Sequence, residues 1–170
     1  MKPLFPKLTM IVLFAFYCSS HYAQTLPNFD LIKLEKAPDY KPAMPFVLQT
    51  ANYLLSVPFE KGNTDRPKAL QFLGKWMSGT PDYSFTLEEV AGKITKGNND
   101  LLGVYMAAMA KYSLENKEGS KDPKLVRLNA LRLLLDYCEN KSNNMMMTKP
   151  LRKLSEAKAK GELEQAVAAL

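Results

Sequence analysis

Histidine and cysteine are scarce in this sequence, which has one histidine, His21, and two cysteines, Cys18 and Cys138, among 170 residues. A structural zinc site takes about four Cys or His ligands, and triad hydrolases need an imidazole base. The motifs G-x-S-x-G, H-E-x-x-H and G-x-G-x-x-G and the P-loop are missing as well. We therefore expect a protein that is not an enzyme and that holds no metal and no cofactor.

The first 23 residues have the layout of a secretory signal peptide. Lys2 and Lys7 give a positive start, an apolar run follows over residues 8–17, and the small residue Ala23 ends the segment. The apolar run is shorter than the roughly 20 residues that a membrane-spanning helix needs. We predict cleavage after Ala23 and export, as a soluble protein, to the periplasm or the outside of the cell.

Cleavage after Ala23 removes Cys18 and His21 and leaves 147 of the 170 residues. The remaining cysteine, Cys138, then has no partner for an internal disulfide. Its apolar helical surroundings predict a buried, unreactive thiol. Lipidation at Cys18 is the alternative, although that modification favours a small residue before the cysteine, where this sequence has Tyr17.

The net charge is too small to indicate nucleic-acid binding. Without the first 23 residues the chain has 21 basic and 17 acidic residues, and nucleic-acid-binding domains carry a stronger basic excess. The excess lies in residues 141–160, where six basic residues stand against one acidic residue. Such a segment can contact anionic lipid or lipopolysaccharide, or it can be a solvated helix face. The candidate contact residues are Arg152, Lys153, Lys158 and Lys160.

Apolar spacing and helix signals predict an all-α fold. Residues 24–42 contain three prolines, and we expect an extended lead-in there. The predicted helices span about 44–56, 65–78, 87–96, 99–116, 123–139 and 149–168, and Gly161 can divide the last one. Short connections favour three antiparallel hairpins in one compact bundle over residues 43–170. A short α-solenoid is the alternative, although no repeat period is found.

Several residues mark the predicted helix ends. The expected N-caps are Thr64 or Asp65, Thr86, Asn98 or Asn99, Asp122 and Thr148. Thr86 and Glu89 have the spacing of a capping box, and Phe85 and Val90 that of a hydrophobic staple. We expect Gly79 to take the left-handed conformation after the second helix.

Two clusters near residue 85 are candidates for function. Trp76, Tyr83 and Phe85 surround a proline-containing turn that forms either a recognition surface or a plug closing one end of the bundle. We favour the plug and keep Tyr83 as a candidate partner-binding residue. The acidic residues Asp82, Glu88 and Glu89 could form a hydrolase carboxylate pair, but helix capping and the helix dipole account for the two glutamates.

Four stretches carry a resemblance to a known group of proteins. They are YLLSVPF (53–59), ALQFLGKWMSGTPDYSF (69–85), KGNNDLLGVYMAAMAKYSLEN (96–116) and LRLLLDYCEN (131–140). They resemble a group of small exported helical proteins from Gram-negative bacteria that has no assigned activity. The resemblance implies one helical domain located in the cell envelope and transfers no site residues.

The first functional hypothesis is therefore an exported, non-enzymatic helical domain that binds a protein partner or an envelope component. This hypothesis predicts a groove or flat surface with exposed aromatic side chains and no converging acids. A peripheral binder of anionic lipid or lipopolysaccharide is the second hypothesis, and a carboxylate-dependent hydrolase is the third. The hydrolase would need a pocket with at least two ionisable groups of shifted pKa.

Overall fold

The computed structural model describes residues 25–170, and the predicted signal peptide lies outside them; for residues 88–91 it describes the backbone alone. No strand occurs in the described part of the chain. The α-helices are α1 (Ala37–Ser56), α2 (Asp65–Gly79), α3 (Glu88–Thr95), α4 (Asn99–Glu115), α5 (Pro123–Glu139), α6 (Lys149–Ala159) and α7 (Leu163–Ala168). Three short 3-10 helices accompany them: η1 (Phe29–Leu31), η2 (Gly119–Lys121) and η3 (Lys141–Asn143). The all-α prediction is confirmed.

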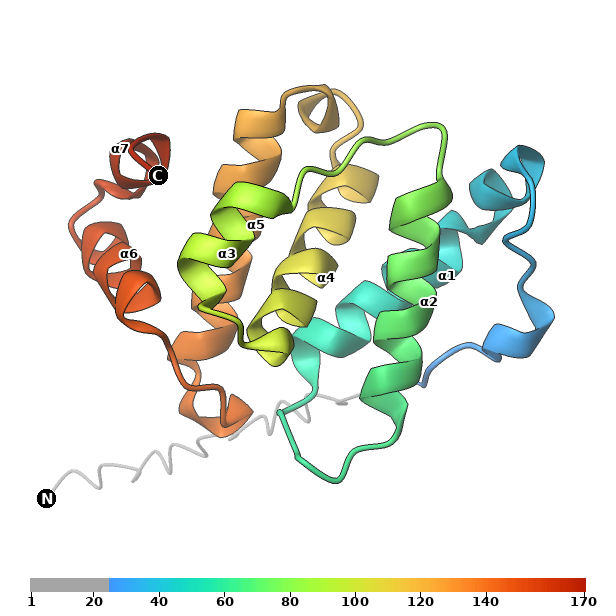
Figure 1. Cartoon of the computed structure of the whole chain (residues 1–170), viewed down its shortest axis with the longest axis horizontal. Helices are drawn as coiled ribbons and strands as arrows, with labels where there is room; N and C mark the ends of the chain where they lie inside the picture. Colours follow the sequence, from blue (N-terminus) through green and yellow to red (C-terminus); the bar gives the residue numbers. More distant parts are fainter. Residues whose placement is uncertain (1–24) are drawn as a thin grey trace, which may run out of the picture.

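Helix α4 lies in the middle of the bundle (Figure 1) and contacts α1, α2, α3 and α5. Its residues Leu101, Val104, Tyr105 and Ala108 are fully buried, as expected of a helix that is apolar around most of its circumference. Each helix from α1 to α7 packs against the next one along the chain except α2 against α3, and α7 also contacts α5. The solenoid alternative is wrong, because α1 contacts α4 and α5, whereas solenoid repeats contact only their neighbours.

Most of the predicted helix ends are confirmed by side-chain hydrogen bonds. The side-chain oxygen of Asn98 accepts from two N–H groups of the first turn of α4, and Asp122 and Thr148 accept from one each in α5 and α6. Gly161, with φ of 78°, separates α6 from α7. The division of the last predicted helix at this glycine is therefore confirmed.

Two predicted caps are wrong. Thr64 makes no side-chain capping bond, and Asn63 Oδ1 instead accepts from the N–H groups of Asp65 and Arg66. Leu87, rather than Thr86, precedes α3 and makes no side-chain capping bond. The capping box and the staple also involve Glu89 and Val90, whose side chains lie outside the described residues.

Helix α1 begins at Ala37, seven residues before the predicted start, so residues 37–42 of the expected lead-in are helical. Pro38 lies in the first turn, where backbone N–H groups have no partner within the helix, so the N–H that proline lacks costs no hydrogen bond. Pro42 and Pro45 lie inside the helix and each removes one backbone bond. Both face the solvent, so water can reach the carbonyl groups that they leave unpaired. On the opposite side, buried residues such as Tyr40 join the core.

Gly79 does not have the left-handed conformation that its sequence position suggested. It is the last residue of α2, and the only glycines with positive φ in the described chain are Gly97 and Gly161. A Cβ atom at Gly79 would overlap the Tyr40 hydroxyl group. The glycine is therefore needed for the close approach of α2 to α1.

The buried apolar side chains of the described residues form one hydrophobic cluster, to which every α-helix except α3 contributes several members. Helix α3 contributes Ile94. Among residues 25–170, no helix combines the length and the apolar character needed to cross a bilayer.

Candidate functional site

Residues 25–36, here called the N-terminal segment, run along one end of the bundle beside α1 and α2 (Figure 1). Its apolar side chains attach it to the helices, because Leu34 is buried and the Phe29 ring stacks on Phe72 with 4.7 Å between centroids. One hydrogen bond joins its start to α1, from Gln49 Nε2 to the Thr25 carbonyl at 2.6 Å. The segment thus forms one wall of the concave surfaces described next.

A cavity of about 490 Å³ opens between the N-terminal segment and the first half of α1. We call it the apolar groove; it is lined by Pro27, Asn28, Leu31, Ile32, Lys33, Pro38, Asp39, Pro42, Ala43, Phe46 and Gln49. Only four large apolar side chains of the described chain are exposed, and two of them line this groove. They are Leu31, 79% exposed, and Phe46, 41% exposed. Exposed apolar side chains that line one concave surface are typical of a binding site.

The walls of the apolar groove are held in place by proline rings and by hydrogen bonds. Pro27, Pro38 and Pro42 have restricted φ angles. Asp39 Oδ2 accepts from the N–H groups of Glu35 and Lys36, both at 3.1 Å. These two backbone hydrogen bonds lower the pKa of the Asp39 carboxyl group. A groove with rigid walls loses less conformational entropy when a ligand binds.

The lining of the apolar groove carries few charges. Its lining contains one cation, Lys33, and one carboxylate, Asp39. The Asp39 carboxylate caps the start of α1, and no second acid lies in the lining. This arrangement agrees with the surface that the partner-binding hypothesis predicts.

A second cavity, of about 560 Å³, lies against the other side of the N-terminal segment and shares Pro27, Asn28 and Ile32 with the apolar groove. Its wall on α2 is more polar and includes Lys68 and Lys75. The N-terminal segment is therefore flanked by hollows on both sides.

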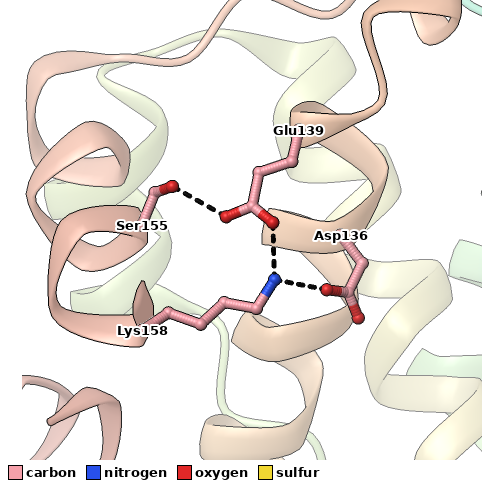
Figure 2. Close-up of polar contacts among 4 residues, drawn as sticks. All are labelled: Asp136, Glu139, Ser155 and Lys158. Atoms are coloured by element: carbon pink, nitrogen blue, oxygen red, sulfur yellow. Dashed lines mark hydrogen bonds and ion pairs between the residues drawn. The ribbon is translucent and has the colours of Figure 1, made fainter. Parts of the chain in front are cut away.

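The candidate basic residues of α6 and of its C-cap position, Lys160, divide into two groups. Arg152, Lys153 and Lys160 are exposed, and Arg152 Nη1 donates to the Met147 carbonyl at 3.0 Å. Lys158, in contrast, is paired with two carboxylates of α5 (Figure 2). Helix α6 and the N-terminal segment lie at opposite ends of the bundle (Figure 1), so these two candidate surfaces can be altered separately.

The Lys158 contact is a structural link between α5 and α6. Its Nζ lies 2.5 Å from Asp136 Oδ1 and 2.6 Å from Glu139 Oε2, and Ser155 Oγ donates to the other Glu139 oxygen at 2.7 Å (Figure 2). Partial burial works against the charged form of Lys158, but the bonds to Asp136 and Glu139 outweigh it and raise the lysine pKa. A cation with two carboxylate partners contributes little to an anion-binding surface.

Tyr83 belongs to the aromatic cluster that the sequence indicated. Its ring centroid lies 5.7 Å from that of Trp76 and 6.3 Å from that of Phe85. Trp76 is fully buried, and the two other rings are half-buried over it. Burial, with a smaller effect of the Asp82 charge, raises the pKa of Tyr83. The packing agrees with a plug at the end of the bundle.

The other candidate chemical groups are the acidic residues near Asp82, a metal-binding cluster and Cys138. Asp82 is exposed on the turn after α2, while the side chains of Glu88 and Glu89 lie outside the described residues. In the described chain no three His, Cys, Asp or Glu side chains form a metal-binding group. Cys138 is buried, and desolvation, with a smaller effect from Glu139, raises its pKa to about 12. The predicted buried thiol is confirmed.

Comparison of the chain with protein-family models, curated proteins and solved structures finds no match. The resemblance to exported helical proteins of Gram-negative bacteria therefore stays a prediction. The apolar groove was not among the sites expected from the sequence, because Leu31 and Phe46 are 15 positions apart and lie in different elements. The sequence offers one signal for the groove, which is the long apolar side chain of Leu31 in a proline-rich stretch.

Proposed function

We propose that this protein is an exported, non-enzymatic helical domain that binds a protein partner through the apolar groove. The exposure of Leu31 and Phe46 in one groove is the observation that carries the proposal. Solvent exposure of these side chains is unfavourable, and a partner that covers them gains the free energy of burying them. Because the lining has one charge of each sign, the partner's contacting segment is expected to be apolar and uncharged.

The proposal is tested with a double variant, Leu31→Ser with Phe46→Ser. The matched control is Met146→Ser, because Met146 is 82% exposed and lies outside the groove. Each protein is used as bait in envelope extracts of its host, and the Kd of any captured protein is then measured with purified components. Loss of two anchors of this kind is expected to weaken binding by about two orders of magnitude, and the control is expected to bind like the wild type. Equal binding by the double variant and the wild type would contradict the proposal.

A second candidate function rests on the exposed cations of α6 and of the residue that follows it. Arg152, Lys153 and Lys160 take part in no ion pair among the described residues, and about 1 kcal/mol per basic residue is available near anionic lipid. The candidate function is a peripheral contact with anionic lipid or lipopolysaccharide. Lys158 is not expected to take part in it, because it is paired with two carboxylates. It predicts binding to anionic vesicles that decreases steeply as salt is added and that is lost in an Arg152→Gln, Lys153→Gln variant. Vesicle binding that does not change with salt would exclude it.

A further inference from the structure

A third exposed apolar side chain lies outside the apolar groove. Leu125, in the first turn of α5, is 40% exposed. It lines a cavity of about 190 Å³, here called the α5–α7 cavity, between two helices that are in contact (Figure 1). The other apolar members of its lining are Leu128, Val167 and Ala168. None of the lining residues belongs to the apolar groove, so the α5–α7 cavity is a separate concave surface.

Two cations border the α5–α7 cavity. Lys124 is exposed and Arg127 is half-buried, and neither takes part in an ion pair among residues 25–170. The Arg127 guanidinium group has no acceptor in this part of the chain, where the only buried side-chain polar atoms without a partner are Arg66 Nη2 and the Tyr105 hydroxyl oxygen. The Arg127 nitrogen atoms are therefore open to solvent, and both positive charges can act on a ligand in the cavity.

The lining contains one carboxylate, that of Glu164 in the first turn of α7. Glu164 takes part in no ion pair among the described residues, so it does not neutralise either cation by direct contact. Two cations and one carboxylate give the lining a net formal charge of +1, whereas the apolar groove has one charge of each sign. An apolar cavity with an excess of positive charge is complementary to a molecule with an apolar body and one negative charge.

We propose that the α5–α7 cavity binds a small amphipathic carboxylate, the anion of an unbranched fatty acid with about six carbons. The chain of the ligand contacts Leu125, Leu128 and Val167, and its carboxylate group lies near Lys124 and Arg127. A water molecule occupies about 30 Å³, so a cavity of about 190 Å³ holds roughly six groups of that size, which sets the chain length. Covering the exposed surface of Leu125 favours binding, and the excess charge selects an anionic head group.

The test is a titration of the purified protein with sodium acetate, butyrate and hexanoate, and separately with hexylammonium chloride, at neutral pH and constant ionic strength. Binding is followed by NMR through the backbone amides of residues 124–128 and 163–168. Each methylene group added to the carboxylate is expected to lower the Kd by up to about fourfold. Hexylammonium has the same chain and the opposite charge, and it is expected to bind about tenfold more weakly than hexanoate. The absence of saturable shifts with hexanoate at tens of millimolar, or equal affinity for hexanoate and either acetate or hexylammonium, would overturn the proposal.

Two charge variants and one control locate the carboxylate group. Lys124→Gln changes an exposed side chain at the cavity, so it is expected to leave the fold unchanged and to weaken hexanoate binding several-fold. Arg127→Gln is expected to weaken it further, because Arg127 is the more buried of the two cations. Arg132→Gln removes an exposed arginine of α5 outside the cavity and is expected to bind like the wild type. Wild-type affinity in Lys124→Gln or Arg127→Gln, or equal weakening by Arg132→Gln, would overturn the proposal.

A further variant locates the apolar chain. Leu125→Ser is expected to weaken hexanoate binding several-fold and to leave the weak binding of acetate unchanged, because acetate has no chain to bury. Met146→Ser, which changes an exposed side chain outside the cavity, is the matched control and is expected to bind both carboxylates like the wild type. Equal hexanoate affinity in Leu125→Ser and Met146→Ser would show that the chain does not enter the α5–α7 cavity and would overturn the proposal.

Discussion

Gly79 at the end of α2 lies directly against the hydroxyl group of Tyr40 in α1, with no room for a Cβ atom between them. One turn earlier, Trp76 Nε1 donates a hydrogen bond to the Tyr40 carbonyl at 3.2 Å. Tyr40 Oη in turn donates to the Leu34 carbonyl at 3.4 Å. Tyr40 therefore links α2 to the N-terminal segment that forms a wall of the apolar groove.

Gly79→Ala is expected to destabilise the protein by about 1–3 kcal/mol, because the new methyl group must displace a buried tyrosine ring. Gly92→Ala in α3 is the matched control, since a Cβ atom there meets no atom within 4 Å. The control is expected to be neutral or to stabilise by about 0.5–1 kcal/mol through helix propensity. Urea unfolding followed by circular dichroism measures both changes. An equal effect of the two substitutions would show that the contact with Tyr40 is unimportant.

A second glycine prediction concerns Gly161, which separates α6 from α7 with φ of 78°. A Cβ atom at Gly161 meets no atom within 4 Å, so Gly161→Ala has a backbone cost alone, of about 1–2 kcal/mol. Gly161→Asn is expected to cost less, because asparagine tolerates the left-handed region. Gly62→Ala, which is equally open but has no positive φ, is expected to change the free energy of unfolding by no more than about 0.5 kcal/mol. Equal free energies of unfolding in urea for Gly161→Ala and the wild type would contradict the argument.

The helix ends that were predicted correctly depend on local chemistry. Asp122 before Pro123 indicates a helix start whatever surrounds it, and the bounds of α5 agree with the prediction. The start of α1 differs from the prediction because Pro38 and Pro42, which the prediction places in an extended lead-in, lie within the helix. Their cost is offset by burial on the other side of the same turns, which depends on tertiary packing.

The apolar groove and the burial of Arg66, which is 3% exposed, depend on contacts that no local pattern encodes. Leu31 was not recognised as exposed, because exposure depends on how the N-terminal segment lies on the bundle. In the sequence, no feature distinguishes Arg66 from other residues in the first turn of a helix. Its burial involves Phe59 in the preceding loop and Tyr137, 71 positions later in α5.

Cys138 is expected to be inert in the native protein. Desolvation, together with a smaller effect of Glu139, raises its pKa to about 12, and the side chain is buried. At pH 8 the thiolate fraction is then on the order of one in ten thousand. Labelling with a chromogenic disulfide should therefore be slow in buffer and fast in urea, where Cys138 becomes accessible. Native-state labelling as fast as that of free cysteine would contradict the buried position.

Lys158→Met is expected to loosen the C-terminal helices, because Lys158 joins α6 to Asp136 and Glu139 of α5. The side chains are 26%, 54% and 36% exposed, so solvent screening limits the loss of stability to about 0.2–1 kcal/mol. Lys160→Met, which removes an exposed lysine without such partners, is the control and is expected to have no measurable effect. Thermal unfolding of the two variants beside the wild type measures the difference.

The difference between Lys158→Met and the wild type should also depend on pH. Burial alone would raise the pKa of Glu139, but hydrogen bonds from Lys158 and Ser155 outweigh it and lower the pKa below its ordinary value of 4.5. The contribution of Glu139 is therefore complete above pH 4.5 and is lost as the pH falls through the lowered value. The pKa of Lys158 is raised above 10.5, so its contribution is complete below pH 10.5 and is lost as the pH rises through the raised value. The stability difference should be constant between these limits and should decrease in acid. A difference that keeps its full size after Glu139 is protonated would assign it to side-chain packing instead.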